Sequence, residues 1–351
     1  MDYLNSIFAS EFLGQAVWIW LAFLAAVVAL LAFDLGVVNR NDHEIGVTES
    51  LRLSAFYIVI GLSFSAVIWH LYNNDSPTAS IDPQLLAVSG PERAWTAVQL
   101  YLTGFAVEKT LALDNVFVIS LVFTYLAIPR KYQHRVLFWG IIGVIVLRAI
   151  MIGLGATLVS QYSWTLYIFA VFLIFTGVMM WRKGSEEEDM SQNRILLWLK
   201  RRMNVTPELH GNKFRVRLPD PNTGKLRTYG TPLLLALIFV EIVDLVFAID
   251  SVPAIFAITS DAYIVYTSNI FAILGLRALF FALAAMVERF KYLKYALALT
   301  LVFIGSKIFL GDFFPNGKFP SEWSLGITLG LIASGVAYSL WKTRGHQQAS
   351  A

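Results

Sequence analysis

Cysteine is absent from the 351 residues of the chain. No disulfide, thiolate nucleophile, iron–sulfur ligand or thiol-based electron relay can therefore form. Histidine is scarce, and its five residues all fall in loops or at the ends of apolar segments: His43, His70, His134, His210 and His346. This placement argues against a haem held between paired histidines inside a membrane, and against a histidine-lined path for zinc or copper.

Charge is also scarce. Charged residues make up 15% of the chain, whereas hydrophobic residues make up 57% and aromatic residues 14%. The apolar residues form repeated runs of about 18 or more, the length that an α-helix needs to cross a bilayer. The sequence therefore predicts an all-α polytopic membrane protein with membrane lipid, rather than nucleic acid, around it.

Hydropathy predicts about nine transmembrane helices, at residues 16–38, 51–72, 97–126, 136–158, 164–182, 232–258, 268–287, 294–311 and 323–341. Lys and Arg gather in alternate connections, so that one side of the membrane has only Arg93 and Lys318. By the positive-inside rule, the N-terminus lies outside the cytoplasm and the C-terminus inside it.

The chain then divides into three parts. Residues 1–182 hold spans 1–5, residues 183–231 form a cytoplasmic loop, and residues 232–351 hold spans 6–9 and a short tail. The loop contains an amphipathic stretch near Ile195–Arg202 and a hairpin built from 214–218 and 225–229. It is either a regulatory or partner-binding element or an interfacial linker anchored to anionic lipid, and its basic amphipathic character favours the linker.

Ionisable residues inside spans cost about 2.5–3.5 kcal/mol each on insertion scales, so they are candidates for function. The six acids are Asp34, Glu108, Asp114, Glu241, Asp244 and Asp250. The four bases are Lys109, Arg148, Arg277 and Lys307. The excess of two negative charges would be balanced by a divalent cation or by two protons. The alternative is that these residues are structural ion pairs that hold helices together.

An internal repeat relates spans 3–5 to spans 6–8. Glu108 precedes Asp114 by six residues, as Asp244 precedes Asp250, and each second Asp is followed by a short polar residue, Asn115 or Ser251. The following spans match around Arg148 and Arg277, and the next around Gly177 and Gly305. Because spans 3 and 6 enter the membrane from opposite sides, the repeat is inverted, a plan typical of secondary transporters.

The inverted repeat predicts that Asp114 and Asp250 face each other near the membrane midplane, beside a kink at Pro253 whose freed carbonyls add oxygen ligands. Glu108 and Asp244 either form outer and inner gate sites or pair with Arg277 and Arg148. Glu241 lies three residues before Asp244 and therefore shares its helix face. Asp34 is a further candidate ligand, the alternative being a hydrated carboxylate at a helix end.

The predicted metal ligands are therefore Asp114, Asp250, Glu108, Asp244, Glu241, Asn115, Ser251 and Asp34. Oxygen ligands without Cys or His suit hard cations such as Mg²⁺, Ca²⁺ or Mn²⁺. The chain has no GxxxxGK[ST] phosphate-binding loop, so ion gradients rather than ATP would drive transport. We expect a transporter rather than an enzyme, with no resident cofactor and with metal exchanged for protons.

The motifs LALDNVFVI and VEIVDLVFAIDSVPAIFAIT, with the two LRA pairs, resemble the TerC family of bacterial integral membrane proteins over about Val17–Trp341. The basic loop and ninth span are most similar to its Alx branch, associated with riboswitch control by alkaline pH and manganese. The resemblance implies a LysE-type transporter fold, the bacterial inner membrane and Mn²⁺ efflux. The acidic positions that it carries over are Glu108, Asp114, Asp244 and Asp250, with Asn115 and Ser251 as neighbours.

The family is also linked to redox modulation and to tellurite resistance, which gives two competing functions. A redox modulator needs an electron carrier, and this chain has neither Cys nor membrane-embedded His. A tellurite-resistance scaffold would depend on the 183–231 loop instead of the acids, and its protein partners are not specified by the sequence.

Overall fold

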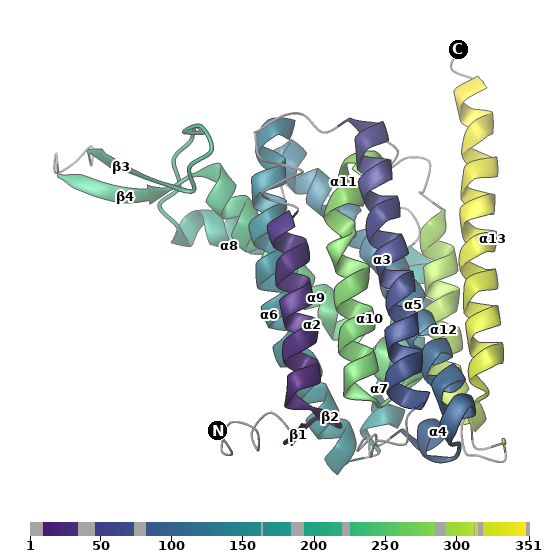
Figure 1. The fold of residues 1–351 in the computed structure, drawn as a ribbon. Helices are drawn as coiled ribbons and strands as arrows, with labels where there is room; N and C mark the ends of the chain where they lie inside the picture. Colours follow the sequence, from purple (N-terminus) through teal and green to yellow (C-terminus); the bar gives the residue numbers. More distant parts are fainter. Residues whose placement is uncertain are drawn as a thin grey trace.

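The computed structural model describes residues 10–33, 46–73, 82–162, 164–183, 193–219, 225–284, 292–311, 313–314 and 319–348. The predicted ligand Asp34 lies outside these residues. The described chain is a bundle of long, roughly antiparallel helices, from which one short helix and a hairpin project sideways (Figure 1). The all-α membrane fold is confirmed.

Within the described residues each predicted span overlaps a helix, and the seventh overlaps two. The long elements are α2 (Val17–Phe33), α3 (Val47–Asn73), α5 (Gly90–Tyr125), α6 (Arg130–Gln161), α7 (Thr165–Lys183), α9 (Pro232–Ile258), α10 (Ala262–Leu274), α11 (Leu276–Ala284), α12 (Leu293–Gly311) and α13 (Ser321–Gln348). Six of them, namely α3, α6, α7, α9, α12 and α13, are long and apolar enough to cross a membrane.

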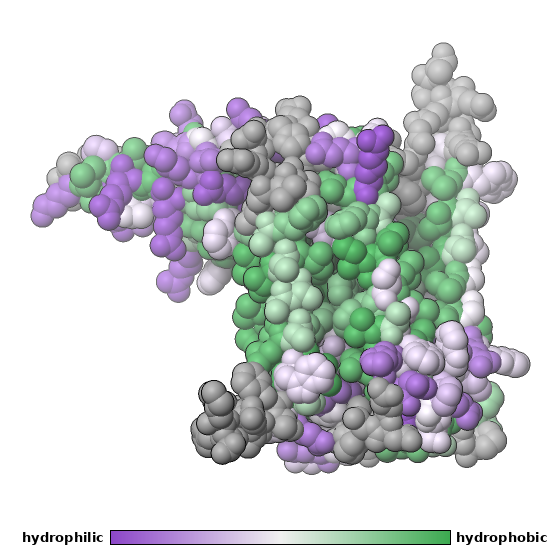
Figure 2. Space-filling model, in the orientation of Figure 1, coloured by the Kyte–Doolittle hydropathy of each residue, from purple (hydrophilic) through white to green (hydrophobic). Residues whose placement is uncertain are grey.

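The outside of the bundle is apolar. Large hydrophobic side chains such as Leu154 and Phe175 are about as exposed as surface residues of a soluble protein, at 59% and 62%. On the face drawn in Figure 2, hydrophobic residues form a broad belt across the bundle, with hydrophilic residues gathered toward its two ends. Because lipid tails are the only solvent that such a belt suits, the chain is an integral membrane protein.

Helices α7 and α12 pack through reciprocal glycines. A Cβ on Gly177 would lie 2.7 Å from the Ala298 carbonyl oxygen, and one on Gly305 would lie 2.7 Å from the Ala170 carbonyl oxygen. The spacing is 128 residues in both cases (305 − 177 and 298 − 170). Two helices related by a two-fold axis would make such a pair of contacts, which supports the predicted inverted repeat.

One predicted span is divided at Gly275, while the predicted kink at Pro253 stays a prediction. Helix α9 runs through Pro253 without ending, whereas the predicted span 268–287 is divided into α10 and α11. A Cβ on Gly275 would lie 2.7 Å from Lys109 Nζ, and that ammonium donates to the Ala272 carbonyl at 3.0 Å. The Lys109 side chain thus satisfies a carbonyl in the last turn of α10, which the sequence did not indicate.

The amphipathic helix and the hairpin of the connecting loop are confirmed. Helix α8 (Arg194–Arg202) buries Leu196 and Leu199 in an apolar cluster with residues of α9. Strands β3 (Arg215–Pro219) and β4 (Leu226–Gly230) pair antiparallel. The remaining short elements are α4 (Pro83–Leu86) and the two-residue strands β1 (Glu11–Phe12) and β2 (Gln15–Ala16), none of which was predicted.

The end of the bundle away from the hairpin is closed by a buried carboxylate. Asp82 caps α4 and accepts hydrogen bonds from the Thr259 hydroxyl at 2.6 Å and from the Ser260 amide at 2.8 Å. These contacts tie α4 to the turn between α9 and α10. Sequence reasoning missed Asp82 because it lies between two predicted spans, where an Asp is ordinary.

Candidate functional site

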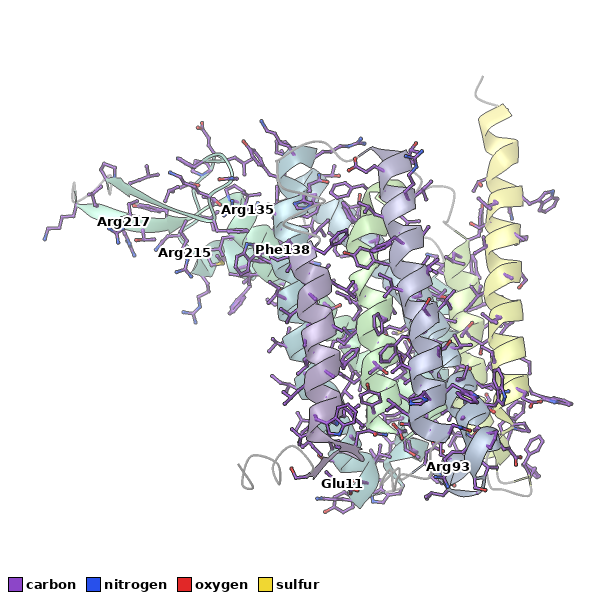
Figure 3. All side chains as sticks on the ribbon, in the orientation of Figure 1. Glu11, Arg93, Arg135, Phe138, Arg215 and Arg217 are labelled. Carbon is purple, nitrogen blue, oxygen red and sulfur yellow. The ribbon has the colours of Figure 1, made fainter. Side chains whose placement is uncertain are left out.

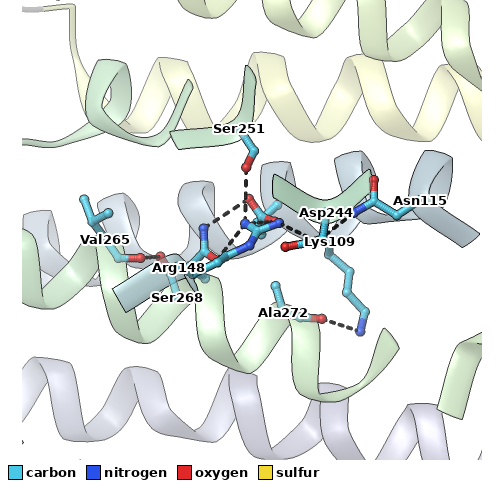
Figure 4. Close-up of polar contacts among 10 residues, drawn as sticks. Lys109, Asn115, Arg148, Asp244, Ser251, Val265, Ser268 and Ala272 are labelled. Carbon is cyan, nitrogen blue, oxygen red and sulfur yellow. Dashed lines mark hydrogen bonds and ion pairs between the residues drawn. The ribbon is translucent and has the colours of Figure 1, made fainter. Parts of the chain in front are cut away.

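A buried arginine lies where α5, α6, α9 and α10 meet. Arg148 of α6 forms an ion pair with Glu108 of α5 and a longer one, of 3.4 Å, with Asp244 of α9. Its guanidinium also donates to Asn269 Oδ1 at 2.8 Å and to Ser251 Oγ at 3.2 Å. Figure 4 shows Arg148 at the centre of this network, between Ser251 and Asp244. One cation therefore joins polar groups from all four helices.

Burial makes this arginine dependent on its partners. Arg148 and Glu108 are each 1% exposed, so neither charge is compensated by water. An unpaired charge in such a place costs several kcal/mol, whereas a planar guanidinium can contact several oxygens at once. The prediction that Arg148 is a partner of membrane acids is confirmed for this residue, while the side chain of Arg277 lies outside the described residues.

Both oxygens of the Glu108 carboxylate have donors. Arg148 contacts Oε1, and the Asn269 amide donates to Oε2 at 3.2 Å. The expected partner of Glu108 was Arg277 or a transported ion, and the structure instead gives it Arg148. Asn269 contacts both members of the ion pair, yet sequence reasoning missed it because an uncharged Asn in an apolar span gives no charge signal.

Only one of the two carboxylate oxygens of Asp244 has a hydrogen-bond donor among the described residues. Its Oδ1 accepts from Arg148 and, at 3.3 Å, from the Asn115 amide, but its Oδ2 is buried and has no donor among the described residues. Asn115 Oδ1 and Glu241 Oε2 are likewise buried without a described partner. A buried acceptor without a donor costs about 1–3 kcal/mol. Three such oxygens in one region indicate a place that a positive ligand would complete.

Two of the three residues line a cavity. Asn115 and Asp244 line it, together with apolar residues of α5, α6, α9, α10 and α11 and with Gly140 of α6. The Glu241 carboxylate lies against Gly143, one helix turn from Gly140, and a Cβ on Gly143 would overlap it. Gly143 of α6 thus leaves space for the Glu241 carboxylate of α9, one helix turn from the residue that lines the cavity.

The other predicted ligands are not all placed. Asp114 and Asp250 belong to α5 and α9, but their side chains lie outside the described residues, so their facing arrangement stays a prediction. Ser251 lies in the Arg148 network. Among the side chains that the structure does describe, no three acidic or histidine residues are grouped as a metal-binding cluster.

The two lysines of the spans lie apart from this centre. Lys109 donates to the end of α10, as described above, although it follows Glu108 directly in the chain. Lys307 of α12 donates to Ser324 of α13 at 3.1 Å and so joins the last two helices. Both bases have structural partners, which leaves Arg148 as the cation at the four-helix junction within the described part of the chain.

Comparison with known proteins identifies the family. The family model described as "Integral membrane protein TerC family" matches residues 93–347. The chain therefore belongs to the TerC family. The match begins at the start of α5 and includes every residue of the Arg148 network, so the junction of α5, α6, α9 and α10 lies inside the TerC region.

Relatives cover nearly the whole length. A membrane protein of Rickettsia felis is 46% identical over 321 residues, 92% of this chain and 97% of its own. One of Myxococcus xanthus is 41% identical over 326 residues, 93% of each chain. A protein of Escherichia coli K12, named as a candidate membrane-bound redox modulator, Alx, is 40% identical over 331 residues, 94% of this chain and 96% of its own. No solved structure matches the chain.

Proposed function

We propose that this TerC protein is a divalent metal ion transporter that exports Mn²⁺, and that the ion passes the junction of α5, α6, α9 and α10. The observation that carries the proposal is the set of three buried oxygens without donors, on Asn115, Glu241 and Asp244. They lie on α5 and α9, two helices of the predicted inverted repeat, and Asn115 and Asp244 line a cavity there. Two of the three belong to carboxylates, and a cation would balance their negative charge as well as occupy their lone pairs.

The ligand chemistry favours a hard cation. The available atoms are carboxylate and amide oxygens, and the chain has no thiol. Such a set suits Mn²⁺, Mg²⁺ or Ca²⁺ and disfavours Cu⁺. Asp114 and Asp250 are adjacent in sequence to Asn115 and Ser251, and we include them as ligands on the strength of the repeat.

The charges also support exchange of the metal for protons. Arg148 is shared between Glu108 and Asp244, so Glu241 and part of the Asp244 charge remain without a described counter-charge. Two carboxylates that are close together repel when the metal leaves, and a proton relieves the repulsion. This balance is our reason for proposing that export is coupled to proton entry.

The proposed location is the bacterial inner membrane, with the N-terminus in the periplasm and the C-terminus in the cytoplasm. Arg93, one of the two basic residues expected outside, lies at the opposite end of the bundle from the hairpin arginines Arg215 and Arg217 (Figure 3). A reporter fused after Ala351 should be active only in the cytoplasm. Periplasmic activity of that fusion would contradict the orientation.

Reconstituted protein provides the direct test. We expect proteoliposomes with an imposed pH gradient to accumulate Mn²⁺ and to move protons in the opposite direction, as reported by an internal pH dye. A double variant, Asp114→Asn with Asp250→Asn, should be well expressed but inactive. Full transport by that double variant would contradict the proposed ligands, and absence of ion movement by the natural chain would contradict transport itself.

A redox role, suggested by the name of the Escherichia coli relative, has less support. Cysteine is absent, and no histidine is among the buried polar residues of the described chain. A direct electron carrier would therefore need a cofactor held by other groups. A scaffold for tellurite resistance would require the loop but not the acids, so normal resistance in the double Asn variant would favour it.

A further inference from the structure

The part of the chain formed by α8, β3 and β4, here called the arm (described residues 193–219 and 225–230), is strongly basic. Between residues 193 and 230 the sequence has nine Lys and Arg against two acids, Glu208 and Asp220. Figure 2 shows the arm as a hydrophilic projection beside one end of the hydrophobic belt. The arm thus extends sideways over the region where lipid headgroups surround the bundle.

The arm is fixed to the bundle at its base. Leu196 and Leu199 are buried among residues of α9, and Lys200 Nζ is 3.2 Å from the hydroxyl of Tyr125 at the end of α5. The guanidinium of Arg135, in the first turns of α6, lies 5.4 Å from the centre of the Phe214 ring. These contacts hold the hairpin in a defined direction relative to the bilayer instead of leaving it on a free linker.

The two faces of the hairpin differ. Arg217 pairs with Thr228 and Pro219 with Leu226, so Arg215, Arg217, Leu226 and Thr228 share one face. All four are exposed, and Leu226 is 72% exposed. We call them the arginine face. On the opposite face Val216, Leu218 and Tyr229 are partly buried, with Lys225 and Arg227 exposed beside them.

Helix α8 continues the same chemistry. Its buried side carries Leu196 and Leu199, whereas Trp198 is 56% exposed and Ile195 is 37% exposed, next to Arg194, Arg201 and Arg202. Tryptophan beside basic residues is typical of helices that lie in a membrane interface, where the ring sits among headgroups and the cations meet phosphate. Exposed apolar and basic side chains therefore occur together on both elements of the arm.

We propose that the arginine face, with Trp198, binds the headgroups of anionic phospholipids in the bilayer that surrounds the bundle. The lipid surface supplies a negative counter-charge for Arg215 and Arg217, for which no ion pair is found among the described residues, and its interface accepts Leu226 and Trp198. In Figure 3, Arg215 and Arg217 are labelled on the lower side of the hairpin, the side toward the level of the membrane-spanning helices. A basic residue near an anionic membrane surface strengthens binding about fivefold. The proposal does not depend on which ion the bundle carries.

The absence of cysteine makes a site-specific test simple. The full-length chain with Thr228→Cys carries a spin label on the arginine face, and Arg227→Cys carries one on the opposite face. Each protein is placed in nanodiscs of phosphatidylcholine alone or with phosphatidylglycerol. We expect phosphatidylglycerol to lower the water accessibility of the label at position 228 at least several-fold, and to change the label at position 227 much less.

Charge reversal then separates the arginine face from general basicity. In the Thr228→Cys background, Arg215→Glu with Arg217→Glu should abolish the effect of phosphatidylglycerol. The matched pair Lys225→Glu with Arg227→Glu makes the same charge change on the other face and should preserve it. Equal accessibility in both lipids, or equal loss in both double variants, would overturn the proposal. Unchanged thermal unfolding of the bundle shows that each variant is folded.

Discussion

Replacing Arg148 with Ala should remove most of the folded protein from the membrane. The change leaves the Glu108 carboxylate, which is 1% exposed, without its ion pair, and it leaves Asp244 without the same cation. Breaking a buried pair by removing one partner costs about 3–5 kcal/mol, a large part of the stability of an ordinary domain. Abundance of a fluorescent fusion and thermal unfolding in detergent measure the loss.

Two further variants identify the cause. Arg130→Ala removes an exposed arginine from the start of the same helix and should leave abundance unchanged. Arg148→Ala combined with Glu108→Gln and Asp244→Asn has no unpaired charge at this position, so it should regain much of the folded protein without regaining transport. Normal abundance of Arg148→Ala alone, with transport lost, would instead give Arg148 a direct part in the transport cycle.

Much of the fold could be predicted from the sequence because a bilayer imposes simple rules. Apolar runs had to be helices long enough to span it, and the reciprocal packing of Gly177 and Gly305 follows from the matched order of their spans. Charged residues in those spans had to find partners, which singled out Arg148 and Asp244. Because burying polar groups in a membrane is costly, the sequence pattern indicated both the positions of the helices and the charged residues that need partners.

The partners themselves could not be predicted in the same way. Glu108 was expected either to form a gate site or to pair with Arg277, and it contacts Arg148 and Asn269, because the side chains that meet depend on helix rotation and approach. At the division at Gly275, a lysine from a different helix donates to the Ala272 carbonyl, a contact that no sequence pattern indicates. Helix α9 continues through Pro253, as a helix of a membrane bundle can when neighbours satisfy the freed groups.

Replacing Asp244 with Asn should abolish efficient Mn²⁺ transport while the protein stays folded. Asn has nearly the same shape and retains the Oδ1 atom that accepts from Arg148 and Asn115, and Arg148 keeps its pair with Glu108. What disappears is the negative charge on Oδ2, the buried oxygen that has no donor within the described chain. The substitution therefore tests that oxygen as a metal ligand.

The expected loss is large because the charge acts on a divalent ion at short range. Two unit charges about 4 Å apart interact by about 4 kcal/mol at an effective dielectric constant of about 20. Even about 2 kcal/mol of that would lower the affinity for the ion about thirtyfold. Glu241→Gln should act in the same direction, since Glu241 Oε2 is the second carboxylate oxygen without a described donor.

Initial rates of Mn²⁺ uptake into proteoliposomes, measured over a range of Mn²⁺ concentrations, give the transport rate and the apparent affinity for the ion. These two values test whether Asp244 is a metal ligand. Glu322→Gln removes an exposed carboxylate from the first turn of α13 and should transport like the natural chain. If Asp244→Asn also transports at the natural rate and affinity, its free oxygen is not a ligand. The carboxylate would then serve only to hold Arg148, and the ion would have to rely on Glu241, Asp114 and Asp250.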